Sequence, residues 1–146
     1  MLALRPAVDE DKPFIEAAFF AEHRWMIEKL VTWRGDEFER MQFYERFVLD
    51  ITSIIVVDGI DIGWISVRRD SQSICLEEIT VLRAWQNQGL GTLLIRQLIE
   101  EARTKKLPLR LSTAKINPAR RLYERLGFRV TGELQFKVEM EIPAPA

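Results

Sequence analysis

The stretch Leu76–Leu98, LEEITVLRAWQNQGLGTLLIRQL, decides how this chain folds. It begins as an apolar strand ending at Val81, passes through a polar turn and becomes the first half of an amphipathic helix. Two glycines, Gly89 and Gly91, stand where that helix begins. Glycine lets main chain come close to a ligand, and the first N–H groups of a helix lack intrahelical acceptors and lie at its positive end. The stretch therefore predicts a pocket for a phosphate or a diphosphate.

The residues around the two glycines show which known phosphate-binding motifs the chain can and cannot match. The dinucleotide fingerprint G-x-G-x-x-G needs a glycine where this chain has Leu94, and the phosphate loop G-x-x-x-x-G-K-[ST] is absent. Both differences disfavour a nucleotide-binding α/β domain. The motif that the chain does carry is Q-x-x-G-x-G, from Gln86 to Gly91, directly after a strand.

A second motif lies further along the chain. The segment Asn117–Phe128, NPARRLYERLGF, and the Q-x-x-G-x-G turn occur in this order, separated by one predicted helix and one predicted strand. In both motifs the chain resembles the GNAT superfamily of N-acetyltransferases. The resemblance covers roughly the second half of the chain, and the first half carries no comparable match.

The resemblance implies acetyl-CoA as co-substrate. In that superfamily the glycine turn holds the pyrophosphate through backbone amides, and free main-chain groups near Val81, Leu82 and Arg83 pair with the amides of the pantetheine arm. Asn117 is implied to bond the pantetheine or a structural water, and capping of the following helix is its alternative role. The residues implied to bind acetyl-CoA are Val81, Leu82, Arg83, Gln88, Gly89, Leu90, Gly91, Thr92, Asn117 and Tyr123.

The expected fold is α/β (α+β): a single GNAT-like domain over residues 1–142, with a disordered tail at 143–146. An antiparallel meander followed by strand–helix–strand–helix–strand predicts a mixed, mostly antiparallel sheet of six or seven strands with helices on both faces. The parallel pair joins strands 74–81 and 107–112 through a right-handed crossover, and the resemblance implies that these strands splay apart at their C-terminal ends. The other expected strands are 2–5, 53–57, 62–68, 128–131 and 133–141, and the expected helices follow residues 9–11, 36, 89 and 117, with a further helical stretch at 23–31.

Acetyl transfer to an amine needs groups that handle protons. The amine must lose a proton although its pKa lies near ~10, and the leaving thiolate gains from a proton donor. A backbone N–H near Val81 is the candidate donor to the oxyanion. Tyr123 occupies the tyrosine of the second motif and is the candidate donor to the thiolate. The alternative is a purely structural Tyr123, because it shares an apolar stripe with Leu122 and Leu126.

The candidate bases are Glu77 and Glu78, which are adjacent in an otherwise apolar strand. Successive strand residues point to opposite faces, so at least one carboxylate faces a covered side, where burial would raise its pKa. The strand resembles that of polyamine acetyltransferases, in which the glutamate matching Glu77 is the base. An ion pair with an arginine or simple exposure is the alternative for either residue. Ser112 stands where several protein N-terminal acetyltransferases carry a catalytic glutamate, which weakens the case for a protein N-terminus as acceptor.

Other chemically versatile residues carry weaker signals. His23, the only histidine, has no Cys or Asp at ligand spacing and is expected to pack or face solvent, and Cys75 is expected to be a buried strand residue. There is no metal-ligand cluster. Arginines are common on surfaces, so Arg83, Arg120 and Arg121 are weak candidates for the CoA phosphates. The residues that could line an acceptor pocket are Trp25, Glu28, Trp33, Glu37 and Tyr44, although core aromatics and solvated acids are the favoured interpretation for each.

Composition limits the class of protein. The chain has 146 residues, 47% of them apolar, and a formal charge of -1, which gives no broad electrostatic reason to bind nucleic acid or an anionic membrane. One cysteine forms no internal disulfide, the N-terminus shows no signal peptide, and no apolar run reaches the ~18–20 residues of a membrane span. A soluble cytoplasmic protein is expected.

The leading functional hypothesis is an N-acetyltransferase that uses acetyl-CoA and acts on a primary amine of a small molecule or an exposed peptide amino group by direct attack on the thioester. A non-catalytic module that binds or senses acyl-CoA is the alternative. Dimerisation is frequent in the superfamily, so a homodimer is among the assemblies that the resemblance implies.

Overall fold

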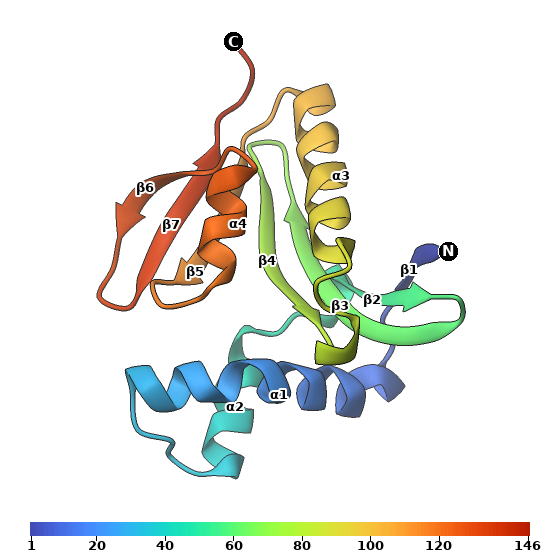
Figure 1. Cartoon of the computed structure of the whole chain (residues 1–146), viewed down its shortest axis with the longest axis vertical. Coiled ribbons are helices and arrows are strands. Elements are labelled where there is room, and N and C mark those ends of the chain that lie inside the picture. The colour runs from blue at the N-terminus through green and yellow to red at the C-terminus, as the bar shows by residue number, and fades with distance from the viewer. The chain divides into compact units, whose positions relative to one another are not determined.

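The computed structural model describes residues 1–146, and its seven strands form one mixed sheet in the order β1-β2-β3-β4-β5-β7-β6 (Figure 1). Strands β4 and β5 are parallel, whereas the pairs β1–β2, β2–β3, β5–β7 and β6–β7 are antiparallel. The predicted mixed sheet is confirmed. The strands are β1 (Leu2–Pro6), β2 (Thr52–Val57), β3 (Ile60–Arg69), β4 (Ile74–Val81), β5 (Leu109–Ala114), β6 (Arg129–Glu133) and β7 (Lys137–Ile142), and the helices are α1 (Lys12–Leu30), α2 (Asp36–Arg46), α3 (Leu90–Lys105) and α4 (Ala119–Arg125).

The chain divides into two compact units, and the first comprises residues 1–66 and 78–85. Its core is an aromatic cluster centred on Trp64 of β3, which is 2% exposed and donates its indole N–H to the carbonyl of Ile15 in α1 at 3.1 Å. A buried indole N–H needs such an acceptor, so this bond fixes α1 against β3. The rings within 6.4 Å of the Trp64 ring, between centroids, are Phe19, Phe43 and Phe47.

The helical region of this unit differs from the prediction in one respect. Residues 12–30 form one helix, α1, and the predicted break before His23 is wrong. No glycine or proline lies between Phe14 and Leu30, so nothing in the local sequence ends the helix there. The next helix begins where expected, because Gly35 adopts φ 101°, which other residues avoid, and α2 starts at Asp36.

Strands β2 and β3 form the predicted hairpin. Its two turn residues, Asp58 and Gly59, have φ angles of 50° and 82°. Two positive φ angles in a two-residue loop match the twist of the flanking strands, and Asp-Gly is a preferred pair for this turn. The turn sets the pairing of Val57 with Ile60 and of Val56 with Asp61, and a bulge between Ile55 and Val56 then shifts the register, so that Trp64 lies opposite Ile54.

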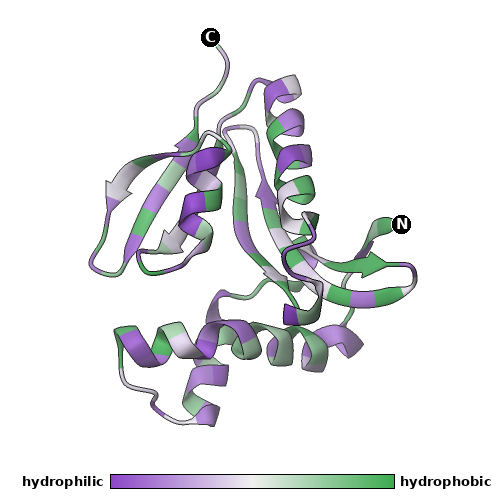
Figure 2. Cartoon of the chain, viewed as in Figure 1, coloured by the Kyte–Doolittle hydropathy of each residue, from purple (hydrophilic) through white to green (hydrophobic).

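The second unit comprises residues 67–77 and 86–146. Figure 2 shows hydrophobic and hydrophilic residues alternating along α3, and the helix buries one apolar stripe. Helix α4 ends at Arg125, and two residues later Gly127 reverses the chain with a φ of 106°, so that the N–H of Phe128 bonds the carbonyl of Tyr123 at 3.0 Å. The residues that form the buried interior of this unit include Ile74, Leu76, Leu94, Ile95, Leu98, Ala102, Leu109, Leu111, Tyr123, Phe128, Val138 and Met140.

Candidate functional site

The turn after β4 has the conformation that the two-glycine motif predicts. A 3-10 turn over Arg83–Trp85 follows the strand, and Asn87 and Gly89 both have positive φ, 61° and 80°. Gly89 is the residue that caps α3, with left-handed geometry and no side-chain hydrogen bond at the cap. Glycine is needed at this position because its backbone lies in a region where a side chain is strained.

Gly91 differs from Gly89, because no feature of the fold requires a glycine there. It lies inside α3 without a positive φ, and a Cβ built on it would meet no heavy atom within 4 Å. Glycine in a helix costs about 0.5–1 kcal/mol relative to alanine. The open space in front of Gly91 therefore fits close approach by a ligand.

The main-chain donors of this turn are arranged for an anion. The first intrahelical bond joins the N–H of Leu93 to the carbonyl of Gly89 at 2.9 Å. The N–H groups of Leu90, Gly91 and Thr92 precede it and have no acceptor within the helix. Together with the helix dipole they can bind a phosphate group. Gln88, the residue before the cap, is exposed.

The parallel pairing of β4 and β5 is short. Its register runs over three positions, from Ile74 opposite Leu109 to Leu76 opposite Leu111. Strand β5 continues to Ala114, and its register with β7 extends that far. The parallel register thus ends well before β5 does.

The main chain after β4 departs from the expectation of free groups near the pantetheine. The N–H of Leu82 donates to the carbonyl of Ile62 in β3 at 2.9 Å, and the carbonyl of Leu82 accepts the N–H of Trp85 at 2.8 Å. The expectation is wrong for Leu82, because one bond anchors it to β3 and the other forms the 3-10 turn. Val81 is half-buried and Arg83 is exposed.

Tyr123 and Asn117 both lie in the second unit. Tyr123 is 7% exposed, and its ring contacts Phe128 edge to face at 5.8 Å between centroids. Asn117 accepts the N–H of Ala119 at 2.9 Å and donates to the hydroxyl of Thr113 at 3.1 Å. Both ends of the Asn117 amide are therefore bonded to protein groups, and its carbonyl oxygen accepts the N–H of the first residue of α4, although the N-cap position itself is held by Pro118.

The adjacent glutamates of β4 have different surroundings. Glu77 has a side chain 40% exposed and pairs with Arg68 at 3.0 Å, which matches the alternative of an exposed ion pair. The side chain of Glu78 is 30% exposed, and its Oε1 lies 3.4 Å from Nε2 of His23 in α1.

His23 is the residue whose environment the sequence did not reveal. Its side chain is 16% exposed, its Nδ1 lies 2.9 Å from the carbonyl of Phe19, and the Phe19 ring stacks on it at 4.3 Å between centroids. Burial lowers the pKa of His23, but the contact with Glu78, the carbonyl of Phe19 and the charge of Glu22 outweigh burial, so the pKa is raised above 6.5. Spacing along the sequence gave no signal for this pair, since α1 and β4 are distant in the chain.

Cys75 is half-buried in β4, less covered than expected. Burial and the charge of Glu77 raise the pKa of its thiol to about 11. The thiol therefore stays protonated near neutral pH and is a poor nucleophile. No group of three or more His, Cys, Asp or Glu side chains is placed to hold a metal ion.

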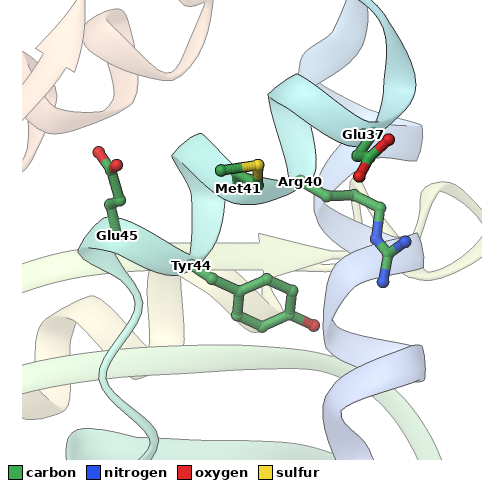
Figure 3. A pocket seen from close by; sticks show the side chains of 5 residues that line it. All are labelled: Glu37, Arg40, Met41, Tyr44 and Glu45. Carbon is green, nitrogen blue, oxygen red and sulfur yellow. The ribbon is translucent and has the colours of Figure 1, made fainter.

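A shallow opening of about 460 Å³ lies along α2 in the first unit, lined by the five residues labelled in Figure 3. The hydroxyl of Tyr44 donates to Glu16 of α1 at 2.8 Å, and Arg40 pairs with the same carboxylate at 2.6 Å. Burial and Glu16 raise the pKa of Tyr44 to about 12, so this phenol stays protonated. Tyr44 and Glu37 line the opening, whereas three other acceptor-pocket candidates lie outside its lining: Glu28 pairs with Arg24, Trp33 donates to Asp36, and Trp25 is exposed.

None of the helices combines the length and the apolar character that crossing a membrane requires. Comparison with curated protein sequences finds no significant match. Solved structures do match in fold. The PaiA N-acetyltransferase of Thermoplasma acidophilum, solved in complex with coenzyme A, is 16% identical with a TM-score of 0.76, each chain covered to 99%. PH1933 from Pyrococcus horikoshii OT3 is 15% identical with a TM-score of 0.74, each chain covered to 100%.

A third structure is Naa50 of Arabidopsis thaliana in complex with a bisubstrate analogue, CoA-Ac-MVNAL, which is 14% identical with a TM-score of 0.65 and 97% of each chain covered. The family model described as "Acetyltransferase (GNAT) domain" matches residues 50–130, more than half of the chain. That range includes the glycine turn, Tyr123 and both glutamates of β4. The chain therefore belongs to the GNAT family of acetyltransferases.

Proposed function

We propose that the chain is an N-acetyltransferase that moves the acetyl group of acetyl-CoA to a primary amine of a small molecule or to an exposed amino group of a peptide. The observation that carries the proposal is the space in front of Gly91, where a glycine stands in a helix although neither backbone conformation nor packing requires it. The related Naa50 structure, with an analogue joining CoA to a peptide, supports an amino group as acceptor.

The diphosphate of acetyl-CoA is proposed to lie against the turn Gln88–Thr92. The N–H groups of Leu90, Gly91 and Thr92 would donate to its oxygens, and Gly89 provides the left-handed turn that exposes them. The contacts proposed for the pantetheine arm are those of Val81, Arg83 and Asn117. For Asn117 the proposal requires a further contact beside the two protein bonds that its amide already makes.

Direct attack of the amine on the thioester is the proposed mechanism. Acetyl-CoA supplies an activated acetyl group, so the protein needs no nucleophile of its own. The only thiol of the chain supports this mechanism, because the pKa of Cys75 is raised to about 11 and little thiolate exists at neutral pH to accept an acetyl group. The acceptor ammonium loses one proton to a carboxylate of β4, Glu77 or Glu78, and a second when the amide forms.

Tyr123 is proposed to donate a proton to the sulfur of the departing CoA. Its ring is held by burial and by the contact with Phe128, which gives the side chain a fixed orientation. The tyrosine recovers a proton from the reaction, since the nitrogen of the acceptor releases one as the C–S bond breaks. The balance is one amide, one CoA thiol and one proton to solvent for each ammonium acetylated.

The test of the binding site is Gly91→Ala. The new methyl group would stand in the proposed place of the diphosphate, so we expect the Kd for acetyl-CoA to rise at least about tenfold, equivalent to ~1.4 kcal/mol, without loss of fold. Isothermal titration calorimetry measures the Kd. Leu93→Ala is the matched control, because Leu93 is an exposed residue of the same helix whose N–H is already bonded. Equal affinity for Gly91→Ala and wild type would refute the diphosphate site.

The test of the reaction is release of CoA thiol with a panel of amines, including polyamines, amino acids, aminoglycosides and peptides. Tyr123→Phe is expected to lower kcat by at least about tenfold while the Kd for acetyl-CoA stays within a factor of two. Unchanged kcat would remove Tyr123 from the mechanism. Binding of acetyl-CoA with no thiol release from any amine would instead identify a non-catalytic acyl-CoA-binding module.

A further inference from the structure

Both ring nitrogens of His23 face hydrogen-bond acceptors. Nδ1 lies 2.9 Å from the carbonyl oxygen of Phe19, and Nε2 lies 3.4 Å from Oε1 of Glu78. A carbonyl oxygen only accepts, so Nδ1 must carry a proton. A neutral ring with that proton would turn the Nε2 lone pair toward the carboxylate. The geometry is therefore satisfied when His23 is an imidazolium that donates from both nitrogens.

The surroundings of the ring hold it in this orientation. The Phe19 ring stacks on it at 4.3 Å between centroids with an interplanar angle of 6°, and the side chain is 16% exposed. The carbonyl of Phe19 lies one turn earlier in α1, so the ring is fixed by its own helix and presents Nε2 to β4. His23 thus has a defined orientation before any substrate binds.

Glu78 is held at one oxygen. Its Oε1 receives the contact with His23 and also accepts the N–H of Ile79 at 3.1 Å, and neither contact involves Oε2. A carboxylate fixed through one oxygen can use the other to accept a proton. Glu77 lacks such fixation by a buried partner, because it pairs with Arg68, whose side chain is 50% exposed, and exposed pairs of this kind are weak.

We propose that His23 is a positioning residue that holds the carboxylate of Glu78 so that Glu78, rather than Glu77, accepts the proton from the acceptor ammonium. The inference rests on the proposed function. The proton moves from the ammonium nitrogen to the carboxylate, the neutral amine attacks the thioester carbon, and Glu78 later returns its proton to solvent. His23 keeps its own protons throughout and acts only through Glu78.

The charge of His23 depends on pH in a defined direction. The charged groups that act on it are Glu78 of β4 and Glu22 of α1, and with the carbonyl of Phe19 they raise its pKa above 6.5 against the effect of burial. A histidine with a raised pKa in the folded state stabilises the fold fully below about pH 6.5, and the contribution is lost as pH rises through the folded-state pKa. The positioning of Glu78 should weaken over the same range.

The first experiment is an NMR titration that follows the Hε1 ring proton of His23. This proton gives a single signal because the chain has one histidine. The wild type is expected to titrate above pH 6.5, and Glu78→Gln to titrate at a lower pH. Glu77→Gln is the matched control and should leave the His23 titration in place. Equal titration of wild type and Glu78→Gln would overturn the pair, and this result needs neither acetyl-CoA nor an acceptor.

The second experiment compares kcat/KM of wild type and His23→Gln across pH with an amine that releases thiol. Glutamine keeps an N–H donor but carries no charge, so we expect it to lower kcat/KM about tenfold at pH 6. The titration of the acceptor is common to both proteins and cancels in their ratio. That ratio should fall toward one as pH rises through the pKa that NMR gives for His23, a trend that a merely structural role would not produce.

The outcomes separate the two proposals. If thiol is released but the ratio of kcat/KM between wild type and His23→Gln does not change with pH, the positioning role is overturned. The acetyltransferase proposal is then unaffected. Absence of thiol release with every amine overturns the proposed reaction and the role of His23 together. A perturbed His23 titration with the expected change in the ratio supports both.

Discussion

Two glycines of this protein occupy opposite kinds of environment. At Gly63 in β3, a Cβ would lie 2.1 Å from the carbonyl oxygen of Thr80, so main chain already fills the space that a side chain would need. At Gly91 in α3, a Cβ would meet no atom within 4 Å. The first glycine is required by the packing of the first unit. The second is required by no contact within the protein, so it has the open space that the proposed diphosphate site needs.

The largest change in the free energy of unfolding is expected for substitution of Gly63. Gly63→Ala forces the main chain of β3 or β4 to move, because the atom that it would meet belongs to backbone. We expect a loss of about 3 kcal/mol in the free energy of unfolding, as for an overpacked core. Urea denaturation followed by circular dichroism measures the change. Stability equal to that of the wild type would show that β4 can move away. Gly63 would then not be required by packing, and the contrast with Gly91 would not hold.

A smaller loss is expected at Gly89. Its φ of 80° strains any residue with a side chain, although a Cβ at this position would have no atom within 4 Å. Gly89→Ala should lower the free energy of unfolding by about 1–2 kcal/mol. Gly89→Asn is the matched variant, because asparagine tolerates the left-handed region better, and it should lose less. Equal losses for the two substitutions would argue against backbone strain as the cause.

Substitution of Gly91 is expected to stabilise the fold, whereas substitution of Gly63 or Gly89 destabilises it. Without acetyl-CoA, Gly91→Ala should raise the free energy of unfolding by about 0.5–1 kcal/mol, since alanine favours helix and meets no obstruction. A thermal melt with and without acetyl-CoA tests the comparison directly. The variant should melt higher than wild type alone and gain less from the ligand. A loss of stability without ligand would place Gly91 with the structural glycines.

A gain in stability as small as that at Gly91 is expected at Thr80, the neighbour of Gly63. Its hydroxyl oxygen is buried and has no hydrogen-bond partner. Replacement by valine removes an unsatisfied polar group at nearly constant shape, so Thr80→Val should raise the free energy of unfolding by about 0.5–1 kcal/mol. Urea denaturation checks it, with Thr113→Val as the contrasting variant, because the hydroxyl of Thr113 accepts a bond from Asn117. Destabilisation by Thr80→Val would indicate that its hydroxyl has a partner in solution.

The part of the fold that local sequence determines could be predicted. Strand β4 has the predicted bounds, the Asp58-Gly59 turn has the predicted geometry, and α3 begins one residue after Gly89. Each depends on residues close in the chain, such as a turn pair, a glycine cap or an apolar period. The predicted break in α1 is wrong. The polar residues Glu22 and His23 interrupt the apolar pattern, but polar residues do not end a helix.

The parts of the site that depend on tertiary contacts could not be predicted. The bond between Leu82 and Ile62 comes from the packing of β4 on β3, and the contact between His23 and Glu78 joins a helix to a strand. Neither leaves a spacing pattern in the sequence. The left-handed turn at Gly89 could be predicted because it depends on residues close in the chain, whereas binding of a diphosphate at this turn stays a prediction. Whether Tyr123, Glu77 and Glu78 act in catalysis stays a prediction.

The state of Cys75 has a practical consequence for measuring this enzyme. Reagents that detect free thiols react with the thiolate form, and a group with a pKa of about 11 presents almost none of it at about pH 7.5. The CoA set free by turnover, with a thiol pKa near ~8.5 by analogy with cysteine, reacts far more readily. A colorimetric assay should therefore record product against a nearly flat background from the polypeptide itself, even at high protein concentration.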